Sequence, residues 1–334
     1  MTESQSRYDL VTFGDGFLRL VAPGFGRIEQ VNSVQVHVAG QSLETAVAAS
    51  RMGLSTAWVS IVADNPLGQK IINKAREHNV DTSSSRRSEQ GRVGLVYTEK
   101  GSAPRTTVDI EDMAGATFGN GSEFELDWSI LDESRLLYLD LDAAIRYAGS
   151  LSLFRAASDR AQASDCAICV SLGDYFADGS EEYVQDIQEF CQHAEIILTT
   201  KRAAMRMCPD EMDLETLAER LKSDHGTPIV SVTDHRFDTP RICSWKASVV
   251  IGTGTKNRPL ADQEYKVDVV DAAGANGAFA GGFLYGYLTH NARTGLQFGN
   301  ATAALAHSVP GNISWATADD IASQLTGSGT KLQR

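Results

Sequence analysis

The chain has 334 residues, 42% of them hydrophobic, and a formal net charge of −13. This composition excludes disorder as the main state, because such a chain can bury a substantial core as one large α/β domain or two smaller ones. The acidic balance disfavours contact with nucleic acid and with anionic membranes, since both need clustered Lys and Arg. No apolar run reaches the ~18 residues of a membrane span, and the opening MTESQSRYD lacks the order of a signal peptide. We therefore expect a cytoplasmic protein.

Strand-like and helix-like segments alternate along most of the chain. The strand-like runs are 9–14, 56–62, 136–141, 166–172, 195–200 and 228–233. The helical patterns lie between them, at 43–52, 66–78, 148–162, 181–191 and 214–225. This alternation predicts a doubly wound α/β fold, in which helices cover both faces of a parallel sheet.

Two segments interrupt the alternation. Phe17–His37 and Arg92–Ile110 read as short strands with Gly and Pro turns and no helix between them. They predict a small antiparallel sheet that stands off the main one as a lid, a dimer face, or both. We expect a single domain over residues 1–330, with lid segments at about 15–38 and 92–112 and a flexible tail at 327–334.

The five cysteines do not form a disulfide framework, because their number is odd and they are scattered through the second half of the chain. Cys166 and Cys169 make a CxxC inside a strand-like run, without a second Cys or His pair at zinc spacing. They predict buried core thiols, with a metal or redox role as the less favoured alternative.

A glycine-rich loop carries the strongest local signal. Asp271–Phe283 reads DAAGANGAFAGGF and joins a strand-like VDVV to an apolar helical stretch. A helix that begins this way leaves backbone N–H groups free to bind an anion. We assign this anion hole to Gly274, Ala275, Asn276 and Gly277; close helix packing is the alternative use of such small residues.

From Val11 to about Leu325 the chain resembles the ribokinase-like (PfkB) sugar kinases, most closely the 2-keto-3-deoxygluconate kinase branch. The ordered matches are GDGFLRL, VHVAG, TAWVSIVADNPLGQKI, HNVDTS, VGLVYTEKGSAPR, VDVVDAAGANGAFAGGFLYG and FGNATAALAHSVPG. The resemblance implies a Rossmann-like α/β body with a small β lid over the sugar site, and a homodimer through the lid.

The resemblance also implies catalytic and sugar-binding positions, several of which are altered here. The family's general-base Asp corresponds to Gly277, so no catalytic residue is assigned. An Asn that binds sugar hydroxyls corresponds to Glu44. We take the possible substrate pocket to comprise Asp15, Gly40, Glu44 and Arg105.

The positions that serve ATP and Mg²⁺ are altered as well. The family's Asn-x-x-Glu falls on Thr200 and Ala203, so no metal ligand is expected. The Asp-x-Asn-x-Arg pattern falls on Gly173, Tyr175 and Ala177. The bulky His235–Phe237, which we interpret as part of a polar loop, replaces a glycine turn.

Two late residues and one acidic residue each have two readings. Asn300 and His307 fall in the region that borders the nucleotide in the family, or are ordinary helix positions. Asp271 offers a substitute carboxylate, but its spacing favours capping or loop hydrogen bonds instead.

These losses predict a pseudokinase with a regulatory, scaffold or subunit role, in which an active paralogue or another protein is its partner. The alternatives are a slow sugar-acid kinase that uses ATP and Mg²⁺, and a small-molecule sensor. No cofactor is expected unless the kinase alternative holds.

Overall fold

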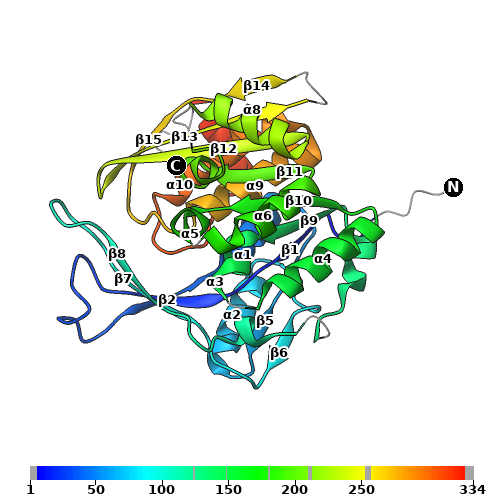
Figure 1. Ribbon diagram of the computed structural model, residues 1–334. Coiled ribbons are helices and arrows are strands. Elements are labelled where there is room, and N and C mark those ends of the chain that lie inside the picture. Colours follow the sequence, from blue (N-terminus) through cyan, green and yellow to red (C-terminus); the bar gives the residue numbers. More distant parts are fainter. Residues whose placement is uncertain are drawn as a thin grey trace.

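The computed structural model describes residues 6–122, 125–147, 149–179, 181–209, 213–252 and 257–327. Its body is built on a nine-stranded sheet in the order β14-β13-β12-β11-β10-β9-β1-β4, with β15 also paired to β13 (Figure 1). Six neighbouring strands run parallel, and their largely buried, apolar sequences are typical of a sheet covered on both faces. The parallel strands are β1 (Leu10–Phe13), β4 (Thr56–Val59), β9 (Leu136–Asp140), β10 (Ala167–Leu172), β11 (Ile196–Thr200) and β12 (Ile229–Thr239).

The remaining strands of the body make an antiparallel edge. They are β13 (Ile242–Ile251), β14 (Arg258–Ala261) and β15 (Tyr265–Asp268). The predicted parallel sheet is thus confirmed, with an antiparallel extension that the strand–helix alternation did not indicate. A separate two-stranded pair joins β5 (Ile61–Ala63) to β6 (Arg86–Ser88).

Helices cover both faces of the sheet, as predicted. Successive strand residues belong to different cores: Val11 and Phe13 pack with one set of helices, and Leu10 packs with the other. The first core takes residues from α4 (Leu151–Ala163), α6 (Val184–Gln192) and α8 (Leu214–His225), and the second from α1 (Gln41–Met52), α9 (Ala275–Thr289) and α10 (Ala292–Ala306). The other helices are α2 (Pro66–Glu77), α3 (Leu141–Arg146), α5 (Asp174–Asp178), α7 (Lys201–Met207) and α11 (Ala318–Leu325).

A four-stranded sheet in the order β3-β2-β7-β8 stands apart from the body, and Figure 1 shows β2, β7 and β8 extending away from it. We call this sheet the lid. It contains both segments predicted for it, which confirms the separate small sheet, but it is mixed and not antiparallel as predicted, because β2 and β7 pair in parallel. Its strands are β2 (Phe17–Val21), β3 (Gln35–Ala39), β7 (Leu95–Glu99) and β8 (Val108–Asp112).

One local prediction was wrong. His235–Phe237 belongs to β12, which pairs with β13 as far as Thr239, and not to a loop. This end of the strand is more exposed than its buried start, so polar and bulky side chains fit there. The predicted tail lies outside the described residues beyond Gly327, and none of the described helices has the length and apolar character that a membrane crossing requires.

Candidate functional site

The amino end of α9 has a backbone suited to binding an anion. Gly274 precedes the helix with φ +81°, a conformation that glycine adopts without strain. A Cβ at this position would also overlap the carbonyl oxygen of Asn312. Among the described residues, no side chain caps the first turn, so its first N–H groups have no side-chain acceptor. The backbone predicted for Gly274–Gly277 is therefore present.

Gly277 lies directly against Glu44 of helix α1. A Cβ added at position 277 would be 2.5 Å from the Cβ of Glu44 and 2.9 Å from its Oε2. One turn further along α9, a Cβ at Gly281 would be 2.5 Å from the Cβ of Ala48. The two glycines therefore allow α9 and α1 to pack closely, and the Glu44 carboxylate occupies the space that a side chain at 277 would need.

Glu44 is a buried carboxyl group with one bound and one free oxygen. Its Oε1 accepts hydrogen bonds from the backbone N–H of Gly40 at 3.2 Å and from Asn312 Nδ2 at 3.0 Å. None of the described residues donates to Oε2. Burial raises the pKa of Glu44 to about 7, although both hydrogen bonds and Arg19 oppose the rise. This carboxyl group can therefore change protonation state near neutral pH.

The lid contributes two cations to the same site. Arg19 on β2 binds both oxygens of Asp271, at 3.0 and 3.1 Å, and donates to Asn312 Oδ1 at 3.3 Å. Lys100 lies 3.0 Å from Asp271 Oδ2. Burial alone would raise the pKa of Asp271, but Arg19 and Lys100 hold it below its ordinary value. Asp271 is thus an anchor for the lid, and Asn312 connects this ion pair to Glu44.

A second buried ion pair lies under the lid. Asp15 Oδ2 accepts hydrogen bonds from Arg146 and from the Tyr147 hydroxyl, both at 2.8 Å. Its Oδ1 has no hydrogen-bond partner among the described residues. Gly40 has φ +135°, and a Cβ there would overlap the carbonyl oxygen of Asp15. Because Gly40 has no side chain, the start of α1 can lie directly against the backbone of Asp15.

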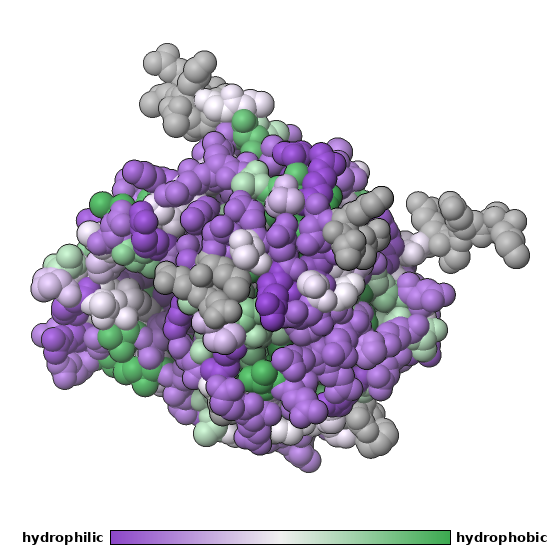
Figure 2. Space-filling view, turned by 45° about the horizontal axis from the view of Figure 1, so that its top comes forward, coloured by the Kyte–Doolittle hydropathy of each residue, from purple (hydrophilic) through white to green (hydrophobic). Residues whose placement is uncertain are grey.

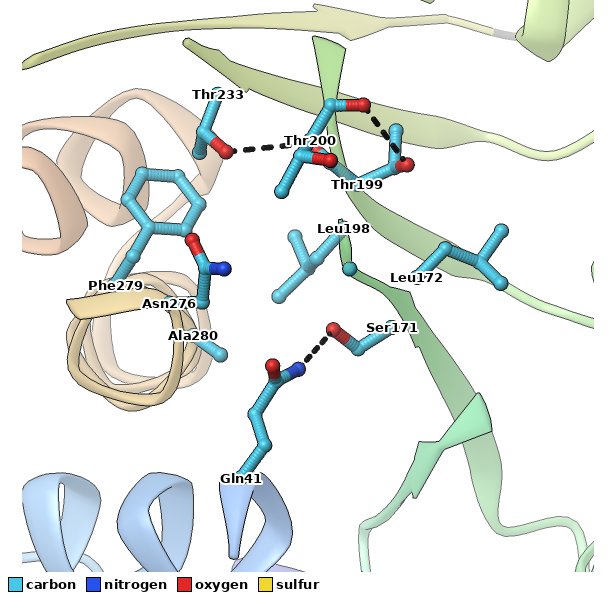
Figure 3. A pocket seen from close by; sticks show the side chains of 11 residues that line it. Gln41, Ser171, Leu172, Leu198, Thr199, Thr200, Thr233, Asn276, Phe279 and Ala280 are labelled. Atoms are coloured by element: carbon cyan, nitrogen blue, oxygen red, sulfur yellow. Dashed lines mark hydrogen bonds between the residues drawn. The ribbon is translucent and has the colours of Figure 1, made fainter. Parts of the chain in front are cut away.

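A small hollow lies at the carboxyl ends of β10, β11 and β12, beside the start of α9. Figure 3 shows the side chains of Gln41, Thr233 and Asn276 around it, and Gln41 Nε2 donates to Ser171 Oγ at 2.7 Å. Its volume is about 10 Å³, which is the space of about one water molecule. The enclosed space alone is therefore too small for a nucleotide.

The donors around this hollow do not form a dedicated metal cage. Thr200 takes the helix-capping role at the start of α7, donating to Asp174 Oδ1 at 3.1 Å and accepting from Ala203 N. Asp174 is also 3.6 Å from both Arg202 and His235. Over the described ranges, no three His, Cys, Asp or Glu residues gather in a way that could hold a metal ion.

Comparison with known proteins decides the family. Residues 7–318 match the model of the pfkB family carbohydrate kinases. The chain belongs to the pfkB family. It is 29% identical over 331 residues to a 2-dehydro-3-deoxygalactonokinase from Haloferax volcanii, a match that covers 98% of this chain and 99% of that protein.

Solved structures of pfkB-type proteins share the fold. A 2-dehydro-3-deoxygluconokinase from Thermotoga maritima superposes with a TM-score of 0.87 at 22% identity, covering 95% of this chain and 99% of that one. A protein from E. coli, provisionally assigned as a ribokinase II and bound to ATP and Mg²⁺, gives a TM-score of 0.79 at 16% identity, covering 96% and 99%. The ribokinase-like fold expected from the sequence is thus confirmed.

Three of the residues proposed for ligand binding in this pfkB protein have partners within the protein. Arg105 donates to the carbonyl oxygen of Phe25 at 2.5 Å, in an exposed part of the lid. Asn300 and His307 are almost completely buried: Asn300 accepts a hydrogen bond from the Trp245 indole, and the His307 imidazole pairs with the Ala303 carbonyl. Their partners give all three structural roles, and the binding roles proposed for them stay predictions.

Gly173 and Tyr175, which fall on the family's phosphate and sugar-acid pattern, contribute backbone groups. Their N–H groups and that of Phe176 donate to the Asp142 carboxylate at 3.0–3.3 Å. The Asp142 carboxylate thereby fixes the start of α5, and burial raises its pKa despite these bonds.

Three residues of the site were missed by sequence reasoning: Arg19, Lys100 and Asn312. Arg19 is the one of them with a visible signal, because it interrupts the apolar strand FLRLV and must find a polar partner if buried. Lys100 and Asn312 lie in turns where polar residues are ordinary.

Proposed function

We propose that this chain is an ATP-dependent kinase that phosphorylates a hydroxyl group of a small sugar acid. The observation that carries the proposal is the uncapped amino end of α9, which faces the Glu44 carboxyl group beneath a lid that bears two cations. Backbone N–H groups at a helix start stabilise the charge that develops on a phosphoryl group during transfer. The match to the Haloferax volcanii kinase over nearly the whole chain supports this class of reaction.

The charges at the seam between lid and body favour an anionic substrate. Arg19 and Lys100 meet one carboxylate, Asp271, so these groups carry one positive charge in excess while Glu44 is protonated. A substrate carboxylate balances this charge, whereas a neutral sugar does not. We therefore propose substrates such as 2-dehydro-3-deoxygalactonate and 2-dehydro-3-deoxygluconate, after the names of the similar kinases.

ATP binding is proposed at the carboxyl ends of β10–β12, in the region of the small hollow. The E. coli neighbour binds ATP and Mg²⁺, which supports the same pair of ligands here. The hydroxyl groups of Thr200 and Thr233 and the amide of Asn276 suit hydrogen bonds to phosphate oxygens or their waters. Because no metal cage is present among the described residues, Mg²⁺ enters as part of the nucleotide substrate, held mainly by phosphates and water.

A noncatalytic role is the second candidate. It is favoured by the absence of a carboxylate at Gly277, Thr200 and Ala203, and by the small volume of the hollow. The position of Glu44 weakens the first of these arguments, because a carboxyl group does reach the space beside Gly277. In this second role the chain would serve as a subunit or scaffold for another protein.

An ATP turnover assay separates the two candidates. Purified protein with Mg–ATP should form ADP when either of the two sugar acids is added, with ribose and fructose as neutral controls. Phosphorus NMR should show a new phosphate monoester in equal amount. If neither acid stimulates ADP formation, the kinase proposal is wrong and the noncatalytic role stands.

We also propose that the lid forms a homodimer. Phe25, Val34, Val36, Val108 and Ile110 are all 37–50% exposed, and all lie on the lid or its connections. On the left of Figure 2, the side to which the lid extends in Figure 1, hydrophobic side chains lie among hydrophilic ones. A second lid would cover these side chains. The cytoplasmic location and the lack of nucleic-acid contact stay predictions from the sequence.

A further inference from the structure

Helices α1 and α9 bring one carboxyl group to a defined point at the start of α9. Because Gly277 and Gly281 have no side chains, the two helix backbones approach closely enough for Glu44 to lie over the first turn of α9. The Oε2 of Glu44 is 2.9 Å from the position that a Cβ of residue 277 would take. A carboxylate on α1 therefore fills the volume that a short acidic side chain on α9 would fill.

We propose that Glu44 is the general base of the phosphoryl transfer. The inference rests on the kinase function proposed above. Glu44 Oε2 accepts the proton of the substrate hydroxyl group as the hydroxyl oxygen forms its bond to the γ-phosphorus of ATP. The bond between that phosphorus and the β,γ-bridging oxygen breaks, and ADP leaves with the bonding electron pair. Glu44, now protonated, later releases its proton to water.

The hydrogen bonds of Glu44 separate its structural role from its chemical role. Oε1 receives the Gly40 N–H and the Asn312 amide, which fix the side chain in place. Oε2 receives no hydrogen bond from any described residue. The side chain is therefore held in place through Oε1, and Oε2 remains available to accept a proton. A purely structural acceptor would need Oε1 alone, and a glutamine would serve it equally well.

The electrostatic surroundings suit a base that works near neutral pH. Burial raises the pKa of Glu44 to about 7, and Asp15 adds to the rise; Arg19 and the two hydrogen bonds oppose it. Asp271 pairs with Arg19 and offsets part of its charge. A base whose pKa lies near the working pH combines a useful population of the charged form with enough basicity to take a proton.

The test compares Glu44→Gln with wild type and with Glu182→Gln, an exposed glutamate outside the site. Steady-state rates with Mg–ATP and the better sugar acid are measured from about pH 5.5 to 9, and ADP affinity is measured by calorimetry. We expect Glu44→Gln to lose about 10²- to 10⁴-fold in kcat while its ADP affinity stays near wild type, because general-base help is ordinarily worth that much. The rise of the wild-type kcat with pH should disappear in this variant.

A second pair of variants tests whether positions 44 and 277 can each place a carboxylate at the same location. Glu44→Asn removes the carboxylate, and Glu44→Asn combined with Gly277→Asp returns one from α9 in the space left by the shorter side chain. We expect the double variant to exceed Glu44→Asn by at least about tenfold in kcat, since a base in the same place restores part of the proton transfer. No recovery would contradict the equivalence of the two positions.

The outcomes distinguish the two proposals. An active wild type whose Glu44→Gln variant keeps a kcat within about threefold would overturn the role of Glu44 and leave the kinase function standing, because so small a loss lies below general-base magnitudes. A wild type that turns over neither sugar acid would remove both. Loss of ADP affinity in Glu44→Gln, with kcat unchanged, would assign this residue to binding instead.

Discussion

Replacing Glu44 with Gln should change how the free energy of unfolding depends on pH. Burial raises the pKa of Glu44 from an ordinary 4.5 to about 7 in the folded protein, so the folded state holds this proton more tightly than the unfolded chain does. The resulting stabilisation is complete below about pH 4.5 and is lost as the pH rises through about 7. Since each tenfold change in proton affinity is about 1.4 kcal/mol, the interval from 4.5 to about 7 corresponds to about 3 kcal/mol.

Urea unfolding of wild type and Glu44→Gln at about pH 5 and pH 8 measures this effect, because glutamine does not titrate and the other groups largely cancel in the difference. The variant should gain about 2–3 kcal/mol relative to wild type between the two pH values. Glu182→Gln, at an exposed position, should show no such trend. A difference between wild type and Glu44→Gln that is the same at both pH values would refute the idea that Glu44 is held in a desolvating site.

Two further predictions concern the helix contact and the lid. Gly277→Asp alone should lower the free energy of unfolding by about 1–3 kcal/mol, since its Cβ would lie 2.5 Å from that of Glu44 in a packed contact; chemical denaturation that matches wild type would show that α1 and α9 yield easily. Ile110→Lys, which places a charge on the exposed face of β8, should convert a dimer into the 36.0 kDa monomer in sedimentation. Wild-type protein that already sediments as the monomer at micromolar concentration would contradict the lid dimer.

The parts of the fold that follow from short-range patterns could be predicted. The buried parallel strands and the amphipathic helices between them have periodicities that appear within a few residues, as in β10 and α6. The lid was found for the same reason, since turn residues separate its short strands. The far half of β12 was missed because DHRFDT is polar, and polarity there reports exposure to solvent and not the end of the strand.

The site was less predictable because its contacts join distant parts of the chain. Gly274 was identified from the residue types that favour a left-handed backbone conformation. Glu44 and Asn312, by contrast, are 268 positions apart, and Arg19 and Asp271 are 252 apart. Position by position, Gly277 reads as a lost base and Glu44 as a lost sugar ligand. The packing of α1 on α9, which no local pattern encodes, shows that the two changes occupy one space.

The close contact of α1 with α9 has a consequence for how the two parts of the site depend on the rest of the chain. The α9 amides and Glu44 belong to helices that touch at Gly277 and Gly281, so the packing of the body sets their spacing. Arg19 and Lys100 come from the lid and meet the body at Asp271. The distance between the amides and the carboxyl group is therefore a property of the body, and the positive charge beside them is a property of the lid. A substitution that detached the lid would remove the cations and leave that distance unchanged.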